Sequence, residues 1–307
     1  MCVVVVVLSA TATAIHAQEV VGKRVFSDTL VIAEPFVEDE LSAPSFLRTR
    51  QPRNGDRPST WATQFGAELK KRLTPDLEAS LTGGIVHLDR GSGPSRTGAD
   101  NLDIGLKYQF FRSEPQEAVA SLALNWEIGG TGRRAVGSEN FDTVRPALLA
   151  GKGLGGLPEP LSWLRPLALT GSLGMILPTE GTTRTESSGR VDRHPNLVQW
   201  GGVIEYSLPY LASFVTHHDL PRPLDRLVPL VEIDMQTAVD RGAAGETRGT
   251  INVGAVWIGR AVQIGAEIVA PANERTRLAL GARAFIRIGL DELSPRLGRP
   301  LFGGSRD

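Results

Sequence analysis

The stretch from Asn101 to Arg112, NLDIGLKYQFFR, alternates apolar and polar residues with a period of two. Side chains of an extended chain point to opposite faces in turn, so one face of this stretch would be apolar. That face would carry Leu102, Ile104, Leu106, Tyr108 and Phe110. A helix would scatter the same side chains around its axis, which favours a strand. The medium that touches the apolar face, a protein core or lipid, then decides what the chain does.

Comparable segments recur along the chain, separated by connections rich in Gly, Pro, Asp and Arg. We expect the fold class to be all-β, a closed antiparallel up-and-down transmembrane β-barrel of about twelve strands spanning 38–290. The expected strands are 38–50, 60–73, 77–90, 100–112, 117–130, 142–153, 163–178, 196–208, 226–239, 248–258, 261–270 and 276–289.

Strand length and loop length both favour a membrane barrel. About a dozen tilted residues span the apolar band of roughly 25 Å, whereas strands of soluble proteins average about five or six residues. Connections at one end are predicted to be long, and those at the other short, apart from Pro209–Asp225, which we expect to be a periplasmic loop or short helix. The long ones are 51–59, 91–99, 131–141, 179–195, 240–247 and 271–275.

Each tryptophan falls near an end of an expected strand, where the aromatic girdle of a membrane barrel lies. The expected girdle residues are Trp61, Trp126, Trp163, Trp200 and Trp257. A secreted soluble β-sandwich would share the alternation, but its apolar faces would have to form a core about 10 Å thick. Such a sandwich stays an alternative.

The start of the chain resembles a secretory leader, since an apolar run from Cys2 breaks into small residues before Gln18. We expect 1–17 to be a signal peptide, which would remove Cys2, the only cysteine. Residues 18–37 would form a periplasmic extension or a plug in the barrel, and 291–307 a C-terminal tail.

Several runs resemble outer-membrane transporter proteins grouped with the phenol meta-degradation pathway outer-membrane family. The resemblance implies a Gram-negative outer-membrane barrel that passes small, often hydrophobic molecules, inserted by the barrel-insertion machinery, which reads a terminal aromatic. Phe285 and Phe302 are imperfect candidates for that aromatic. The runs are PFVEDELSAPSF (35–46), GAELKKRLTPDLEASL (66–81), DNLDIGLKYQFFRSEPQEAVASLALNWEIGGTG (100–132) and LRPLALTGSLG (164–174).

If the apolar faces meet lipid, the polar faces line a lumen that either selects solutes by charge or closes through ion pairs. The expected lumen residues are Gln64, Glu68, Glu78, Asp103, Lys107, Asn125, Glu127, Gln199, Glu205, Glu232, Asp234, Gln236, Arg248, Asn252, Gln263, Glu267, Arg283 and Arg287.

Catalytic and metal motifs are weak. His87 near a strand end could serve a lipid-hydrolysing barrel, but no matching serine or G-x-S-x-G turn accompanies it. The cluster His217–Asp219 lacks further metal ligands, and in Gly151–Gly156 the glycines are followed by prolines where a nucleotide-binding helix should begin.

We therefore predict no enzyme activity, cofactor or metal, and a channel in the outer membrane of a Gram-negative bacterium for passive diffusion of a small-molecule solute. A structural or hydrolytic barrel is the alternative. Expected partners are outer-membrane lipids and lipopolysaccharide, whose phosphates could meet Arg133, Arg134 and the arginines of 179–195. A net charge of −1 gives no sign of a nucleic-acid partner.

Overall fold

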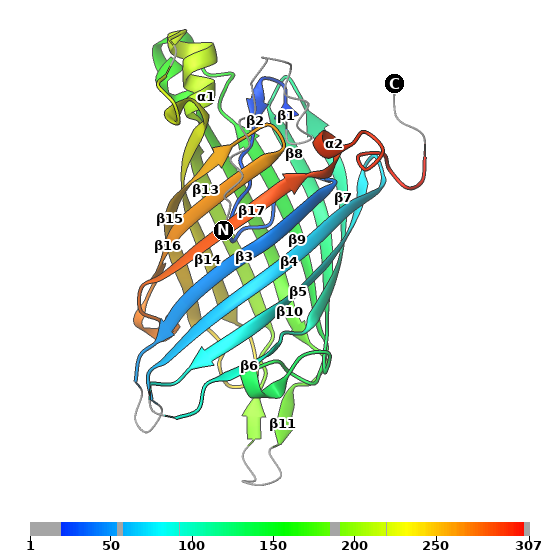
Figure 1. The fold of residues 1–307 in the computed structure, drawn as a ribbon, viewed down its shortest axis with the longest axis vertical. Helices are drawn as coiled ribbons and strands as arrows, with labels where there is room; N and C mark the ends of the chain where they lie inside the picture. The colour runs from blue at the N-terminus through cyan, green and yellow to red at the C-terminus, as the bar shows by residue number, and fades with distance from the viewer. Residues whose placement is uncertain (1–19, 54–57, 92, 185–190, 219, 304–307) are drawn as a thin grey trace, which may run out of the picture.

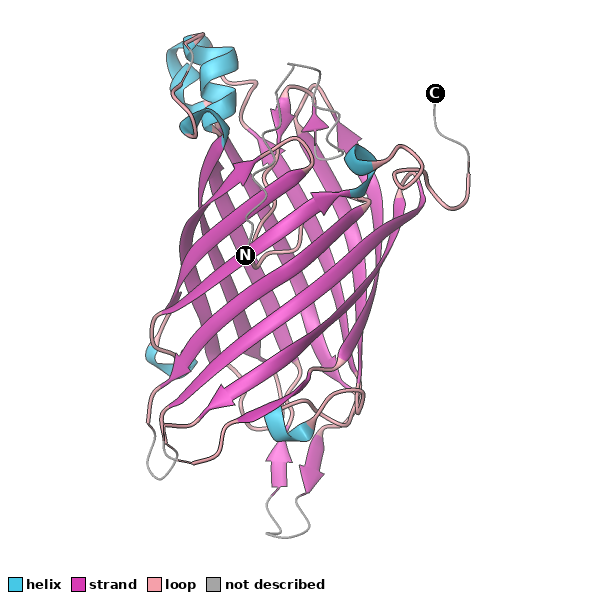
Figure 2. Ribbon diagram, viewed as in Figure 1, coloured by secondary structure: helices cyan, strands magenta, loops and turns pink. Residues whose placement is uncertain are grey.

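The chain folds into a closed antiparallel β-barrel, seen here in a computed structural model (Figures 1 and 2). The structure describes residues 20–53, 58–91, 93–184, 191–218 and 220–303. Twelve long strands pair with their neighbours in sequence, and the pairing of the last strand with the first closes the barrel. The all-β fold class predicted from the alternation is thereby confirmed.

The long strands carry the labels of Figure 1. They are β3 (Glu40–Gln51), β4 (Thr60–Thr74), β5 (Leu77–Asp89), β7 (Leu102–Ser113), β8 (Ala118–Ile128), β9 (Thr143–Gly153), β10 (Leu167–Pro178), β13 (Leu197–Tyr206), β14 (Leu227–Ala238), β15 (Thr247–Ile258), β16 (Val262–Pro271) and β17 (Gly281–Gly289). The short strands are β1 (Val20–Val21), β2 (Arg24–Val25), β6 (Arg96–Ala99), β11 (Thr182–Arg184) and β12 (Val191–Arg193).

Three predicted boundaries were wrong. The strand expected from residue 163 begins at Leu167, because Glu159–Leu164 forms the 3₁₀ helix η2. The strand expected from residue 276 begins at Gly281, because the Asn273 side chain caps a 3₁₀ turn, η5 (Glu274–Thr276). The connection expected over 91–99 contains a strand, β6, which pairs with β5.

The two ends of the barrel differ (Figure 1). One, here the plug end, carries β1, β2, the helices α1 (Leu208–Leu211) and α2 (Leu290–Leu293) and the π-helix η3 (Ala212–Thr216). The other, the loop end, carries β6, η1 (Arg134–Val136), β11 and β12. The connection expected as a loop or short helix thus contains α1, η3 and η4 (Leu224–Arg226). None of the helices described is long and apolar enough to cross a bilayer.

The two faces of the strands have opposite chemistry. On β7 the side chains of Ile104 and Leu106 are 41% and 46% exposed, whereas Asp103 and Lys107 are 8% and 9% exposed. Large apolar side chains are exposed on the outer face of the other long strands as well, and polar ones are buried inside. An exterior of this kind is stable against hydrocarbon and unfavourable against water. The barrel therefore has the inside-out polarity of a membrane barrel.

A charge on the outer face should prevent the barrel from forming in a bilayer. Leu124 on β8 is 47% exposed on that face, and we expect Leu124→Arg to cost about 2–4 kcal/mol if it lies near the bilayer midplane. The yield of folded protein in liposomes, measured by gel mobility without boiling, should drop. Gln64→Arg, on the lumen face of β4, is the control and should fold normally.

The C-terminal tail lies against the plug end. The backbone amides of Leu301 and Phe302 donate to the carbonyls of Arg72 and Leu73, at 3.1 and 2.7 Å. Neither candidate terminal aromatic ends the last strand on its outer face. Phe285 is buried on the lumen face of β17, and Phe302 lies beyond α2 with an exposed ring.

Candidate channel lumen and its N-terminal plug

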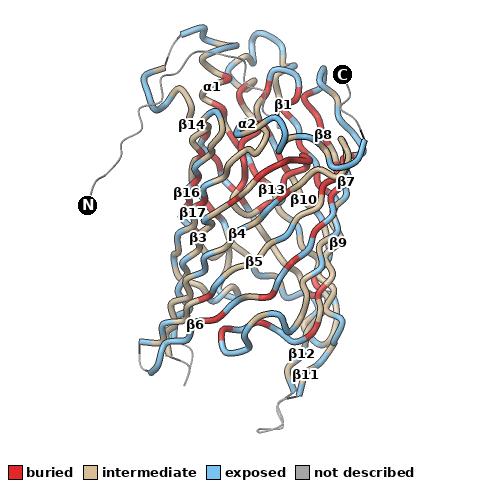
Figure 3. The backbone as a smooth tube through the Cα atoms, turned by 45° about the vertical axis from the view of Figure 1, so that its right-hand side comes forward, coloured by how far each residue is buried: buried red, intermediate tan, exposed pale blue. Residues whose placement is uncertain are grey.

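Residues 20–39, here called the plug, occupy the half of the lumen at the plug end (Figure 1). Buried residues gather in this half of the barrel (Figure 3). The plug begins with the hairpin β1–β2, whose turn uses Gly22 at φ 65°; a Cβ there would come within 2.5 Å of the Glu114 carbonyl oxygen. Only glycine fits this turn without strain.

Arg24 anchors the hairpin to the barrel wall, with no part of its side chain exposed. Its Nε donates to Glu117 at 3.0 Å and its Nη1 to the Pro166 carbonyl at 2.9 Å, while Nη2 donates to the Arg165 carbonyl. The guanidinium also lies 4.4 Å from the ring centroid of Tyr210, in the segment that contains α1. A buried arginine held by one carboxylate and two carbonyls is fully compensated, so this is a firm attachment.

Two wall glutamates hold the next segment of the plug through its backbone. Glu205 accepts hydrogen bonds from the Ser27 amide, at 3.1 Å, and from the Ser27 hydroxyl. Glu232 accepts from three successive amides, those of Leu30 at 2.7 Å, Val31 at 2.8 Å and Ile32 at 3.2 Å. Charge-assisted bonds of this kind are about twice as strong as neutral ones. The plug therefore adopts a defined conformation inside the barrel.

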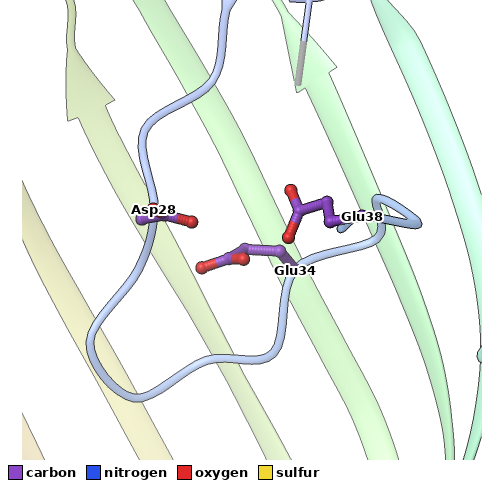
Figure 4. A group of neighbouring side chains, drawn as sticks. All are labelled: Asp28, Glu34 and Glu38. Carbon is purple, nitrogen blue, oxygen red and sulfur yellow. The ribbon is translucent and has the colours of Figure 1, made fainter. Parts of the chain in front are cut away.

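Three plug carboxylates, Asp28, Glu34 and Glu38, converge in the lumen with their oxygens within 4.8 Å of one another (Figure 4). Two wall cations face them. Arg287 contacts Asp28 and lies 2.6 Å from Glu34, and Lys70 lies 3.4 Å from Glu34 and 3.1 Å from Glu38. These ion pairs link the plug to β4 and β17, which lie on opposite sides of β3.

The same charges set the pKa of each plug carboxyl. Burial raises the pKa of Glu38 to about 7, against the pull of Lys70. Burial also raises the pKa of Asp28 well above its ordinary value, although Arg287 opposes this. For Glu34 the cations prevail over burial, and Arg287 and Lys70 hold its pKa below its ordinary value. Glu34 is therefore the carboxylate that the wall cations compensate best.

Apolar contacts complete the attachment. Val21, Phe26 and Phe36 of the plug pack against Val119 and Ala168 of the wall. Ile32 packs in a second cluster with wall side chains of β13–β17, and a Cβ added at Gly201 would collide with its Cδ1. The wall members of that cluster are Val203, Leu230, Val256 and Phe285. Inward-facing apolar residues on these strands thus form a seat for the plug.

A polar cavity of about 240 Å³ borders the plug. Both signs of charge line it: Glu34, Glu68 and Glu78 against Lys70, Lys107 and Arg287. Lys107 pairs with Glu78 at 3.2 Å and donates to the Phe36 carbonyl of the plug. The cavity is large enough for several water molecules or a small solute.

The structure places the predicted lumen residues on the inner face, and several of them bind the plug. Glu205, Glu232, Arg283 and Arg287 bond it directly, as does Lys107. Glu78 accepts from the Glu38 amide at 2.7 Å, and Gln263 from the Asp28 amide at 3.3 Å. The others lie on the wall and form no hydrogen bond with the described residues of the plug: Gln64, Glu68, Asp103, Asn125, Glu127, Gln199, Asp234, Gln236, Arg248, Asn252 and Glu267.

Three functional residues were missed. Lys70 lies two residues after Glu68 on β4 and therefore on the same face of the strand, so the alternation of the sequence could have identified it. Arg145 on β9 contacts Asp103 and lies 3.3 Å from Glu127. It lies four residues before the buried Leu149 and therefore on the same face of the strand, so the alternation could have identified it as well. No sequence pattern identifies the role of Arg24, since its partners lie 93 to 142 residues away.

The predicted girdle tryptophans lie near both ends of the barrel. Trp61, Trp126 and Trp200 lie toward the loop end, and Trp257 toward the plug end. Trp61 stacks with Arg48, at 4.8 Å from the ring centroid. Trp163 lies in η2 rather than on a strand, with 60% of its surface exposed.

Among the described residues, the histidine and glycine motifs of the sequence do not form a catalytic or metal-binding arrangement. His87 Nδ1 lies 2.7 Å from the Thr97 hydroxyl on β6. His217 and His218 follow η3, and Asp219 lies outside the described residues, as do residues 1–19 with the expected signal peptide. Within Gly151–Gly156, the first three residues end β9 and the rest form a turn.

No family model and no curated protein matches the chain, so its grouping with the phenol meta-degradation family stays a prediction. Solved structures share the fold. The COG4313 outer membrane channel from Pseudomonas putida F1 is 13% identical with a TM-score of 0.50, over 82% of this chain and 95% of that one. The KdgM porin and the NanC porin are each 8% identical, with TM-scores of 0.47 and 0.46, over 80% of this chain and 98% of theirs. The chain thus shares its barrel fold with the COG4313 channel.

Proposed function

We propose that the chain is a channel in the outer membrane of a Gram-negative bacterium that lets small molecules cross by passive diffusion. The observation that carries the proposal is the polarity of the barrel, which has an apolar exterior around a lumen lined with charged and amide side chains. Such a wall can solvate polar solutes, and the apolar exterior packs against the lipid chains. The loop end would face outward and the plug end the periplasm.

Because the plug lies inside the lumen, the channel would have to open before a solute could cross it. In the conformation described, residues 20–39 lie in the lumen at the plug end and are bonded to its wall, so we expect flux through that half to require the plug to shift or leave. The same observation favours a second candidate, a barrel that is permanently closed and structural. Single-channel conductance and liposome swelling with the refolded chain separate the two. Resolved opening events support a channel, and no flux under any voltage or solute gradient supports a structural barrel.

The hydrolytic alternative gives a third measurable outcome. His87 bonds Thr97, and among the described residues no serine hydroxyl forms a hydrogen bond with its ring, whereas a Ser/His pair needs such a bond. We expect His87→Ala to leave solute flux unchanged, and the wild-type chain to release no fatty acid from phospholipid vesicles. Phospholipase activity that disappears in His87→Ala would replace the channel with an enzyme.

A further inference from the structure

Two neighbouring polar side chains on the lumen wall lack the bonds that their burial requires. Glu267 on β16 is 4% exposed and Asn252 on β15 is 0% exposed. Among the described residues, no N–H or O–H donor is bonded to either oxygen of Glu267, and neither polar atom of the Asn252 amide forms a hydrogen bond. A buried, unpartnered polar group costs about 1–3 kcal/mol, and more when it is charged. These atoms are therefore available to bind a ligand.

The strand register brings Glu232 into the same group. Glu232 on β14 lies directly opposite Asn252 on β15. Glu267 lies opposite Gly254, where a Cβ would come within 2.7 Å of Glu267 Cγ, so the missing side chain at this glycine gives Glu267 room. The side chains of Glu267 and Glu232 are within hydrogen-bonding reach of each other. Two ionised carboxylates are both acceptors, so a proton or a cation has to lie between them.

The nearest wall cation does not fill this role. Arg283 lies opposite Glu267 in the register, but its Nη1 donates to the Leu30 carbonyl of the plug at 2.7 Å. No ion pair between Arg283 and Glu267 is found among the described residues. The charges acting on Arg283 are those of Glu267, Glu232 and Asp234. Three carboxyl groups therefore share one guanidinium, which already donates to the plug.

We propose that Glu232, Asn252 and Glu267 bind a divalent cation of the hard class, Ca²⁺ or Mg²⁺. Two carboxylates and an amide oxygen form the oxygen-rich ligand set that these ions prefer. Glu232 also accepts the three plug amides, so the bound ion would strengthen the attachment of the plug to the wall. The ion site would lie at the contact between plug and barrel.

The plug carboxylates of Figure 4 differ from Glu267 in that side-chain cations already contact them. Asp28, Glu34 and Glu38 each form an ion pair with Arg287 or Lys70, at 2.6 Å for Glu34 and 3.1 Å for Glu38. An ion binding there would have to compete with side-chain cations that are already in contact. Glu267 has no such competitor.

Heat-induced unfolding of the refolded chain with Ca²⁺, Mg²⁺ or EDTA tests the site. The chain is produced without residues 1–17, in detergent free of lipopolysaccharide, because that lipid binds divalent ions itself. We expect millimolar Ca²⁺ or Mg²⁺ to raise the unfolding temperature of the wild type by several degrees over EDTA, since an ion that binds only the folded state stabilises it. Titration calorimetry should find one ion per chain.

Matched variants locate the site. Glu267→Gln keeps the shape, and its amide can donate to Glu232, so this variant should fold, with an unfolding temperature in EDTA at or above that of the wild type. It should show no shift with the ions, and neither should Asn252→Leu. Glu38→Gln should keep the full shift. The proposal is overturned if neither ion shifts the wild type, if the shift survives in Glu267→Gln, or if Glu38→Gln abolishes it.

Discussion

Deleting residues 20–37 should raise the single-channel conductance by about an order of magnitude, because a lumen of twelve strands without its plug is wide enough to hold water along its length. The wall residues that the plug buries, among them Lys70, Lys107 and Arg287, would then face water and keep their charges. The barrel strands do not depend on the plug for their pairing, so the variant should still fold. Planar-bilayer recordings of the refolded variant beside the full-length chain measure the change.

A reversible cross-link distinguishes opening by removal of the plug from general damage to the barrel. The Ser27 hydroxyl of the plug bonds the Glu205 carboxylate of the wall, so Ser27→Cys combined with Glu205→Cys places two thiols on facing side chains. A short bis-methanethiosulfonate linker can join them through disulfides, in a chain that has no other cysteine once Cys2 is removed. Conductance should be low when the pair is joined and should rise on reduction. Equal conductance in both states, or an unchanged conductance in the deletion variant, would mean that the plug does not control the lumen.

Arg287→Gln should release the plug without shortening the chain. Arg287 contacts Asp28, lies 2.6 Å from Glu34, and donates to the Thr29 carbonyl at 2.7 Å. Removing one partner of a buried ion pair costs about 3–5 kcal/mol, which would shift the docking equilibrium of the plug by about two to four orders of magnitude. The plug can avoid the cost by leaving the lumen. We therefore expect a conductance close to that of the deletion variant.

Arg248→Gln is the matched control for this substitution. Arg248 lies on the lumen face of β15 toward the loop end with an exposed side chain, and the described residues show no ion pair between it and the plug. Its loss should change ion selectivity at most and leave the closed fraction unchanged. If Arg287→Gln opens the channel no more often than Arg248→Gln, the ion pairs of Arg287 do not hold the plug.

The strands could be predicted from sequence because a period of two is a local property of the chain. Residues 102–113 show the pattern with little noise, and β7 begins and ends within two residues of the expected bounds. The starts of β10 and β17 could not be found in the same way, because Leu161–Leu164 and Ala279–Leu280 are apolar enough to resemble strand. Local capping by Asn273 and the 3₁₀ turn of η2 decided those boundaries.

The plug contacts could not be predicted, for a different reason. Leu30 and Glu232 are 202 residues apart, and Thr29 and Arg287 are 258 apart. Such contacts exist only after the barrel closes, and no pattern within residues 18–37 distinguishes a docked segment from a free one. The polar face of each strand predicted which side chains point inward. It could not predict which of them would meet the plug.

In a membrane barrel, hydrocarbon touches Ile104 and Leu124, and water fills the open part of the lumen. A fluorescent probe on Ile104→Cys, in liposomes containing nitroxide-labelled acyl chains, measures this directly, with the same probe on Gln64→Cys for the lumen face. We predict strong quenching by the lipid label at position 104, and quenching only by a water-soluble agent at position 64. Quenching of the position 104 probe by the water-soluble agent alone would contradict a membrane barrel.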